Sequence, residues 1–242
     1  MTPEPILSVN GLSKRFRGLL ATNEVSFSVQ PGSITSVIGP NGAGKSTLFN
    51  LLTGYLPPTA GEVRFKGRPI TGLGTDRIAR LGIARAFQIA RPFRDLTVAE
   101  NVRIGALFGK DGARDVAAVT ARSLALAGLQ DVAGEAATSL TVGQLRHLEI
   151  ARAIATRADL LLADEPCAGL NPTETAAMIA VLRTVRQDGV TVLLVEHDMP
   201  SVMEVSDRII VLDAGSKIAE GTPAEIASNE RVIAAYLGTA TQ

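Results

Sequence analysis

The feature that most constrains the fold is the segment G-P-N-G-A-G-K-S-T at residues 39–47. It follows an apolar run at residues 34–38 and precedes a helical run at residues 48–53. It therefore satisfies the pattern G-x-x-x-x-G-K-[ST] in the strand–loop–helix setting that the pattern requires. Its glycines let successive backbone N–H groups turn toward phosphate oxygens at a helix N-terminus. Lys45 can reach the β- and γ-phosphates, and the Ser46 hydroxyl can coordinate Mg²⁺.

The alternative for this segment is a chance glycine-rich turn. By average composition the bare pattern occurs by accident in roughly 1 of 100 chains of this length, and the strand–loop–helix setting lowers that frequency further. The segment therefore predicts a nucleoside triphosphate site, but it does not name the reaction.

Two further apolar runs, residues 160–163 and 190–195, also end in polar residues. Continuous runs of Val, Ile and Leu of this length suit the buried strands of a parallel sheet. Shorter alternating segments predict additional strands at residues 6–9, 24–29 and 62–65. Residues 209–221 predict a hairpin around Asp213-Ala214-Gly215. The sequence therefore predicts a mixed α/β core.

The pattern changes over residues 92–158, which are rich in Ala, Leu and Arg and contain no convincing strand. This stretch predicts a helical subdomain inserted into the core. Capping boxes and first-turn prolines mark helix starts at Thr97 with Glu100, Asn171 with Pro172 and Glu174, and Thr222 with Pro223 and Glu225.

Two acids, Asp164 and Glu165, directly follow the second apolar run. An Asp at such a strand end beside a phosphate loop can hold Mg²⁺ through its water shell. A second acid directly after it can orient and polarise an attacking water. Solvated acids at an ordinary strand end are the alternative, and the loop that carries Lys45 makes that alternative the weaker one.

Three lone residues stand in places where they can contact a nucleotide. His197 follows the third apolar run, whose strand should lie beside the phosphate strand, so it can contact a γ-phosphate or a water. Gln88 stands at the junction between core and helical subdomain, and by itself this position predicts no function. Phe16 is either a core residue or a stacking face for adenine.

The segment L-T-V-G-Q at residues 140–144 precedes a helical run at residues 145–155. Thr141 and Gln144 have the spacing of a capping box, so the simplest interpretation is a well-capped helix. A further interpretation is that this helix N-terminus receives an anion. Both hold together, because an N-terminus that binds phosphate also needs oriented N–H groups.

The composition excludes several classes of protein. The 24 basic and 24 acidic residues cancel, and a pI near 6.8 argues against a general nucleic-acid binder. A single cysteine, Cys167, excludes a disulfide framework and a thiolate metal cluster. The N-terminus carries no secretory signal pattern, and the longest uncharged stretch, residues 25–44, contains too many Gly and Pro residues for a spanning helix. We therefore expect a soluble chain that works at a membrane only through a partner.

Taken in this order, the residues resemble the ATP-binding subunit of an ABC transporter, from about residue 6 to residue 238. Six elements carry the resemblance: Phe16 is similar to the adenine-stacking aromatic, residues 39–47 to the Walker A loop, Gln88 to the Q-loop glutamine, residues 140–144 to the signature motif, Asp164 and Glu165 to the Walker B pair, and His197 to the switch histidine.

The resemblance implies an α/β fold with a P-loop NTPase (RecA-like) core, an N-terminal antiparallel β layer and an inserted α-helical subdomain. It implies one domain over residues 6–238, with the core at about 6–91 and 159–238 and the helical subdomain at about 92–158. It implies ATP and Mg²⁺ as cofactors. The implied ATP-binding residues are Phe16, Gly39, Asn41, Gly42, Ala43, Gly44, Lys45, Ser46, Thr47, Thr141, Gly143 and Gln144. The implied metal-binding residues are Ser46, Gln88 and Asp164, and the implied catalytic residues are Glu165, His197 and Gln88.

The resemblance also implies partners. They are a second ATP-binding subunit in a head-to-tail dimer, either this chain or a sister chain, two transmembrane permease subunits that dock after Gln88, and indirectly a solute-binding protein. No nucleic acid is implied, and the implied location is peripheral, on the cytoplasmic face of the bacterial inner membrane.

Finer motifs narrow the branch. F-Q-I-A-R-P-F-R-D-L-T-V-A-E-N-V, A-G-L-N-P-T-E, E-H-D-M-P-S-V-M and V-I-A-A-Y-L-G resemble the branched-chain (hydrophobic) amino acid uptake group. Three features depart from the family pattern: Val142 stands where the signature has a glycine, Asn171 stands where an Asp is usual, and the lobe between residues 105 and 126 is short. We expect the Val142 backbone N–H to bind phosphate only if the local turn is ordinary.

The sequence therefore predicts an ATPase that energises an importer for branched-chain or hydrophobic amino acids or related small solutes. One alternative is an exporter of lipid or lipopolysaccharide type. Another is a soluble ABC ATPase of repair or translation, although such proteins usually carry two such domains or a long coiled coil. A GTPase is disfavoured because no N-K-x-D motif is present, and a binding module without turnover because Glu165 is present.

Overall fold

The structure is a computed structural model that describes residues 4–110, 112 and 114–237. The chain divides into two compact units: Met1–Thr75 together with Leu193–Gln242, and Asp76–Val192. We call these the first and the second unit. The domain expected over residues 6–238 stays a prediction, and its last residue, Gly238, lies outside the described residues.

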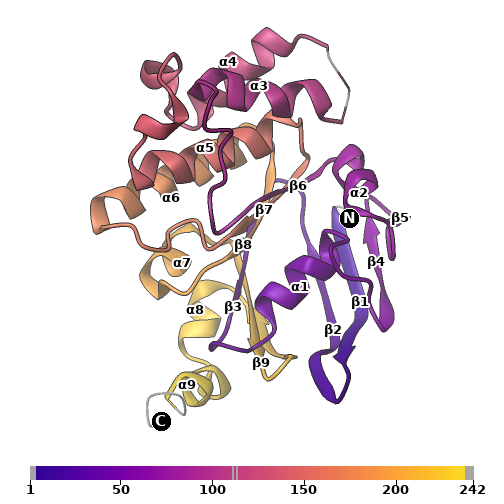
Figure 1. Cartoon of the computed structure of the whole chain (residues 1–242). Helices are drawn as coiled ribbons and strands as arrows, with labels where there is room; N and C mark the ends of the chain where they lie inside the picture. Colours follow the sequence, from indigo (N-terminus) through magenta and orange to yellow (C-terminus); the bar gives the residue numbers. More distant parts are fainter. Residues whose placement is uncertain (1–3, 111, 113, 238–242) are drawn as a thin grey trace. The chain divides into compact units, whose positions relative to one another are not determined.

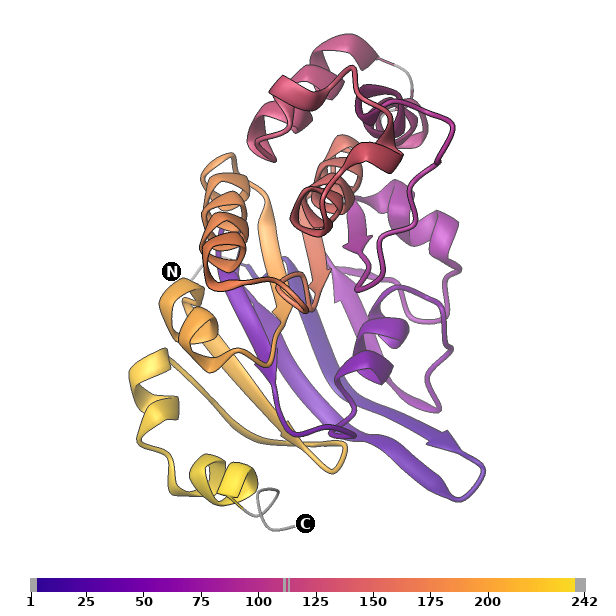
Figure 2. The same cartoon turned by 60° about the vertical axis from the view of Figure 1, so that its left-hand side comes forward.

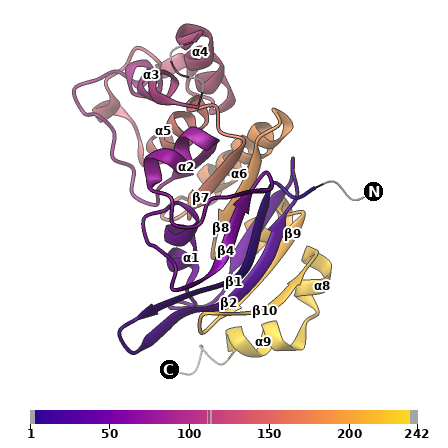
Figure 3. The same cartoon turned by 90° about the vertical axis from the view of Figure 1, so that its right-hand side faces the viewer.

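The first unit contains a four-stranded antiparallel sheet in the order β2-β1-β4-β5 (Figure 3). Its strands are β1 (Leu7–Phe16), β2 (Leu19–Val29), β4 (Ala60–Phe65) and β5 (Arg68–Pro69). Leu7 pairs with Val29 on one side and with Phe65 on the other, and these three side chains are buried. The predicted antiparallel layer is confirmed. Its strands are longer than the alternation indicated, because a register irregularity between Val9 and Leu12 interrupts the pattern.

The remaining strands of the first unit position the phosphate loop. Strand β3 (Ile34–Ile38) is buried throughout, as its apolar run predicted. It pairs in parallel with β9 (Arg208–Asp213), which pairs antiparallel with β10 (Ser216–Gly221). The predicted hairpin is confirmed: Ala214 and Gly215 at its tip have φ of 43° and 81°, the positive values that a two-residue hairpin turn needs.

Three helices cover the strands β3, β9 and β10: α7 (Met199–Val205), α8 (Pro223–Ala227) and α9 (Glu230–Leu237). Val202, Ile226 and Val232, one from each helix, are buried in a cluster with Ile38 and Val211. Figure 2 shows α8 and α9 in yellow, one after the other along the chain. The end of β3, where the phosphate loop begins, therefore packs against the C-terminal helices.

In the second unit, β6 (Ile83–Ala86) pairs in parallel with β7 (Leu160–Asp164), with Ala86 opposite Ala163. Helix α2 (Thr75–Leu81) leads into β6, and α6 (Pro172–Gln187) follows β7. Strand β8 (Thr191–Val195) contains the boundary between the units. The apolar run at residues 160–163 predicted β7, and the capping signal at Asn171 predicted the start of α6. Helix α2 and the strands β5 and β6 were not predicted from the sequence.

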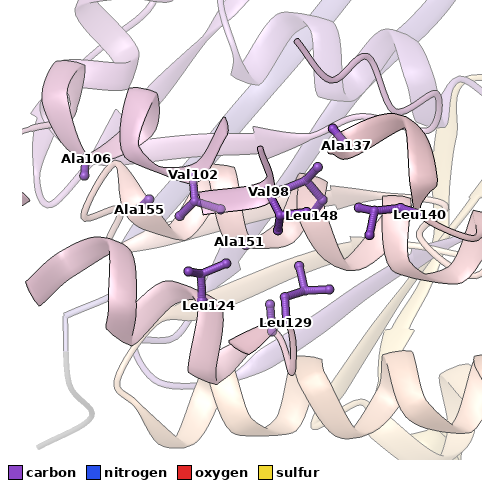
Figure 4. Close-up of a cluster of buried hydrophobic side chains, with 11 residues drawn as sticks. Val98, Val102, Ala106, Leu124, Leu129, Ala137, Leu140, Leu148, Ala151 and Ala155 are labelled. Atoms are coloured by element: carbon purple, nitrogen blue, oxygen red, sulfur yellow. The ribbon is translucent and has the colours of Figure 1, made fainter. Parts of the chain in front are cut away.

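Helices α3 (Val98–Phe108), α4 (Val116–Leu126) and α5 (Val142–Ala155) form the helical part of the second unit (Figure 1). Two 3₁₀ turns, Gln130–Val132 and Ala137–Ser139, connect α4 to α5. Val98, Val102, Leu124, Leu148 and Ala151 are buried and point toward one another (Figure 4). Between residues 92 and 158 the described residues contain no strand, only an isolated bridge between Thr97 and Ala136. The expected helical region is thus observed.

The capping signals predicted from sequence are confirmed. The pairs Thr97–Glu100, Thr141–Gln144, Asn171–Glu174 and Thr222–Glu225 each form a reciprocal capping box at the start of α3, α5, α6 and α8. Helix α5 begins at Val142, three residues before the predicted start, because the cap itself lies at Thr141. Among the described residues, no helix combines the length and the apolar character that crossing a bilayer requires.

Asn101 fixes the chain that enters the helical part. It has no exposed surface. Its amide nitrogen donates to the carbonyls of Phe93, Leu96 and Thr97 at 2.9–3.3 Å, and its amide oxygen accepts from the Phe93 N–H at 2.8 Å. A single side chain therefore binds four main-chain groups of the turn before α3.

We expect Asn101→Ala to lower the free energy of unfolding by about 1–3 kcal/mol, because it removes the hydrogen bonds of a fully buried side chain and takes the acceptor of the Phe93 N–H away. Urea denaturation measures this loss. Asn23→Ala removes an asparagine whose side chain is exposed, so it serves as control and should shift the midpoint little. Equal midpoints for the two variants would contradict the assignment of Asn101.

Candidate functional site

The conformation of the phosphate loop, residues 39–47, requires glycine at particular positions. Gly39, Gly42 and Gly44 have φ of 153°, 81° and 97°. A Cβ at Gly39 would overlap the Leu212 carbonyl oxygen, and a Cβ at Gly44 would lie 2.5 Å from the Ala21 carbonyl oxygen. Both the backbone conformation and the close neighbours therefore require glycine at the two ends of this loop.

Helix α1 (Lys45–Leu52) begins directly after Gly44, and no side chain caps its N-terminus. Lys45 is 7% exposed, and its ammonium donates to the carbonyls of Gly39 at 2.7 Å and Pro40 at 3.0 Å. The positive charge thus lies inside the curve of the loop. Ser46 is exposed and Thr47 half-buried. Oriented N–H groups, a helix N-terminus and an enclosed cation together suit a phosphate.

Two other predicted residues belong to the same unit. Phe16 ends β1 and is 40% exposed, so it is not a core residue. The Lys14 ammonium lies 5.3 Å from the centre of its ring. His197 has a side chain that is 60% exposed, and its backbone N–H donates to the fully buried carboxylate of Glu196 at 3.1 Å. Both rings are therefore partly exposed on the surface of this unit.

The C-terminal helix also reaches the phosphate loop. Tyr236, on α9, packs against the cluster that contains Ile38, the residue before Gly39. Burial raises the pKa of the Tyr236 phenol, and the Gly39 backbone beside it opposes this shift. Tyr236 was not among the residues predicted from the sequence.

In the second unit, the parallel pairing of β6 with β7 brings Gln88 and Glu165 together. Ala86 lies opposite Ala163, and each predicted residue comes two positions later. The Gln88 amide nitrogen donates to the Glu165 Oε2 at 2.6 Å. Glu165 has φ of 47°, a left-handed conformation that costs about 1–2 kcal/mol in a non-glycine residue. A strained carboxylate held by an amide is a typical arrangement of a functional site.

Asp164 has a partner that sequence reasoning missed. Arg85, from β6, donates to the Asp164 Oδ2 at 2.6 Å, and both side chains are 9% exposed. The Arg85 guanidinium also lies 4.9 Å from the centre of the Phe87 ring. The signal in the sequence was an arginine inside the short apolar segment I-A-R-A. A buried arginine requires a buried acid nearby.

The N-terminus of α5 places three further predicted residues. The Thr141 hydroxyl accepts from the Gln144 N–H at 3.2 Å, and the Gln144 side chain accepts from the Thr141 N–H at 2.9 Å. Val142 is the first helical residue, has no positive φ and is 57% exposed. The turn is therefore ordinary, which is the condition under which the Val142 N–H can bind phosphate.

Gly143 lies close to its neighbour Glu174 on α6. A Cβ at Gly143 would lie 3.1 Å from the Glu174 Oε1, which is tighter than an ordinary contact. The Glu174 Oε2 accepts from the Asn171 N–H at 3.0 Å, and the Asn171 side chain accepts in return from the Glu174 N–H. Asn and Asp are equally good N-caps, so the asparagine at this position preserves the cap. Burial lowers the pKa of nearby His147 on α5.

The predicted metal ligands suit Mg²⁺ in their chemistry. A Ser46 hydroxyl, a Gln88 amide oxygen and an Asp164 carboxylate are all hard oxygen donors. Because Arg85 holds the Asp164 Oδ2, Asp164 would act on the ion through Oδ1 or through a water. In the part of the chain that the structure describes, no group of three or more His, Cys, Asp or Glu side chains could hold an ion. Mg²⁺ bound with a nucleotide needs only one or two carboxylates.

The predicted site residues therefore fall into two sets, one within each unit. The first unit holds Phe16, the phosphate loop and His197, and the second holds Gln88, Thr141, Gly143, Gln144, Asp164 and Glu165. Within the second set the structure brings Gln88 into contact with Glu165, and Thr141 into contact with Gln144.

Comparisons with known proteins identify the family of this chain. A family model described as ABC transporter matches residues 22–168. A second model, described as branched-chain amino acid ATP-binding cassette transporter, matches residues 216–241. The chain is 44% identical over 252 residues to the high-affinity branched-chain amino acid transport ATP-binding protein BraF of Pseudomonas aeruginosa, covering 98% of this chain and 99% of BraF.

Solved structures are similar as well. The ADP conformation of an ATP-binding cassette from an ABC transporter has a TM-score of 0.88 at 30% identity and covers 98% of this chain and 100% of that one. A bacterial ABC transporter cassette with a dimeric structure has a TM-score of 0.78 at 27% identity and covers 90% and 98%. These similarities support the predicted fold class, an α/β P-loop core with an antiparallel β layer and an inserted helical subdomain. With a family model matching more than half of its length, this chain belongs to the ABC transporter family as one of the ATP-binding cassettes.

Proposed function

We propose that this chain is the ATP-hydrolysing subunit of an importer for branched-chain or other hydrophobic amino acids. The observation that carries the proposal is the 44% identity with BraF along 98% of the chain. The C-terminal match of residues 216–241 to the branched-chain model supports the same branch independently. The site chemistry described above is that of ATP binding and hydrolysis.

The first unit binds the nucleotide in this proposal. The N–H groups of the phosphate loop and the start of α1 hold the β- and γ-phosphates. The Lys45 ammonium, now bound to Gly39 and Pro40, neutralises their charge. The exposed Phe16 ring stacks on the adenine. Ser46, Gln88 and Asp164 are the residues that would hold Mg²⁺, which when bound would supply positive charge beside the phosphates.

Hydrolysis depends on the carboxylate of Glu165. It accepts a hydrogen bond from Gln88, and in the proposed mechanism it orients the attacking water and takes its proton. Gln88 and His197 then contact the γ-phosphate, so the segments that carry them respond to its presence. The hydrogen bond from Gln88 holds the carboxylate before the substrate arrives, which reduces the cost of ordering it during the reaction.

A second copy of the cassette completes the site. The N-terminus of α5, with Thr141, Gly143 and Gln144, holds the nucleotide bound by the partner, and the dimeric form of a similar cassette supports this pairing. Two permease subunits receive the motion, a solute-binding protein delivers the solute, and the chain lies peripherally at the cytoplasmic face of the cell membrane. The balanced net charge is consistent with partners other than nucleic acid.

We expect Glu165→Gln to reduce ATP turnover by at least about 100-fold, because a positioned general base contributes that much or more. ATP binding should persist, and the variant should accumulate as an ATP-bound dimer. Phosphate release measures turnover, and size-exclusion chromatography with ATP measures the dimer. Glu62→Gln, at an exposed ion pair with Arg64, is the control. Unchanged turnover in Glu165→Gln would overturn the role of this residue.

We expect Lys45→Ala to abolish measurable ATP binding, because the loop loses the one cation that it encloses among the described residues. Isothermal titration with a slowly hydrolysed ATP analogue measures the affinity. Lys217→Ala, which removes a half-buried lysine paired with Glu220 in the same unit, should bind the analogue normally. Equal affinities would show that Lys45 does not hold phosphate.

The transported solute is tested by uptake in cells that lack the gene, complemented with the native chain or with Glu165→Gln. The panel contains labelled leucine, valine, phenylalanine, urea and an aromatic carboxylate. We expect the Glu165→Gln cells to lose leucine and valine uptake. Selective loss of urea or the carboxylate instead would reassign the solute, and unchanged uptake of the whole panel would reject an importer for these compounds.

A further inference from the structure

The main chain at Arg91 is held by two side chains of α5, Glu149 and Arg152. The Glu149 Oε1 accepts from the Arg91 N–H at 3.2 Å. The Arg152 Nη1 donates to the Arg91 carbonyl at 3.0 Å and contacts the same Glu149 oxygen at 2.5 Å. The donor and the acceptor of one peptide residue are therefore both bound by one ion pair. All three residues belong to the second unit.

This ion pair differs from the exposed pairs of the unit. The Glu149 side chain is 9% exposed and that of Arg152 is 23% exposed, whereas Arg122, which pairs with Asp188, is 64% exposed. Exposed pairs contribute little to stability. A largely buried pair carries a desolvation cost that only further hydrogen bonds offset. The Arg91 main chain supplies these hydrogen bonds, so the pair and the segment fix each other.

The chain after Arg91 is anchored as well. The Phe93 ring lies 5.2 Å from the Arg152 guanidinium, and Asn101 on α3 binds both the N–H and the carbonyl of Phe93. Gln88 lies only three residues before Arg91, and its amide binds Glu165. The segment from Gln88 to Phe93 is thus attached at one end to the proposed catalytic carboxylate and at the other end to α3 and α5.

Helix α5 connects this anchor to the capping box at its start. It runs from Val142 to Ala155, and Glu149 and Arg152 lie in its second half, whereas Thr141 and Gln144 form its N-terminal box. Leu148, Ala151 and Ala155 on this helix are buried in one cluster with α3 and α4. One continuous helix therefore carries both the residues that bind Arg91 and the terminus that faces a nucleotide in the proposed dimer.

We propose that Glu149 and Arg152 are positioning residues for ATP hydrolysis: they clamp Arg91, and so hold the segment that carries Gln88 in a fixed place relative to α5. This inference rests on the proposed function for its catalytic consequence. Without the clamp, Gln88 loses a fixed attachment three residues away, so it orients Glu165 for less of the time. ATP turnover then falls, whereas binding through the phosphate loop is retained.

The geometric part of the proposal is tested by amide hydrogen exchange at Arg91 in the full-length chain. Glu149→Ala removes the acceptor, so exchange at Arg91 should accelerate by at least about tenfold. Glu149→Gln keeps an acceptor oxygen and should retain most of the protection, which guards against a variant that simply fails to fold. Arg122→Ala breaks the exposed pair with Asp188 and should leave Arg91 unchanged. Unaltered exchange at Arg91 in Glu149→Ala would overturn the clamp, whatever the ATPase activity.

The catalytic part is tested by steady-state kinetics and a double-mutant cycle with Gln88. Glu149→Ala should lower kcat by about tenfold, less than the roughly 100-fold that a misplaced catalytic group can cause, because Glu149 acts only through Gln88. The dissociation constant of an ATP analogue should stay within about twofold of the native value. In a Gln88→Ala background the same change should lower kcat by less than about twofold, because the residues act through one another.

Each outcome of this double-mutant cycle supports or contradicts the positioning role of Glu149. Equal losses of kcat with and without Gln88 would show that Glu149 acts through general stability and would overturn the positioning role. Normal kcat in Glu149→Ala, with accelerated exchange at Arg91, would also overturn it. A native chain that hydrolyses no ATP would instead contradict the proposed function, and the exchange experiment would still decide the clamp.

Discussion

The parallel pairing of β6 with β7 is the constraint on which the candidate catalytic residues depend. Parallel strands end at the same edge, so residues at equal distances beyond paired positions meet. Arg85 and Asp164 form a buried ion pair at this edge, and Gln88 and Glu165 form a hydrogen bond just past it. A shift of the register by one residue would separate both pairs and expose the Arg85 charge to apolar neighbours. The ion pair therefore fixes the register that the hydrogen bond needs.

Capping boxes connect folding to the proposed chemistry. Thr141 with Gln144 and Asn171 with Glu174 orient the first N–H groups of α5 and α6. Glu174 is shared between both features, because it closes the second box and also packs against Gly143 in the first helix. The position that the family pattern associates with phosphate is thus also a packing position. A side chain here would have to displace the Glu174 carboxylate, in addition to any effect on phosphate binding.

The local features of this chain could be predicted from sequence. The phosphate loop is specified by adjacent residues, and the strands β3 and β7 by uninterrupted apolar runs. Strand β6 was missed because it has only four residues and carries Arg85 among them. Its charge looks incompatible with a buried strand until Asp164, 79 positions away, is placed beside it. Single-sequence patterns contain no such distance information.

The same limit explains why Glu149, Arg152 and Asn101 were missed. Each sits in a helical stretch where its spacing suggests a solvated face, and each binds the main chain of residues 91–97 instead. Every residue carries the same backbone groups. A side chain that binds them therefore has no particular partner residue type that a sequence pattern could reveal. Burial is the only signal, since Asn101 and Glu149 are almost inaccessible. In this cassette the residues proposed to carry the chemistry were visible in the sequence, whereas the residues that bind the main chain beside them became visible only through their contacts.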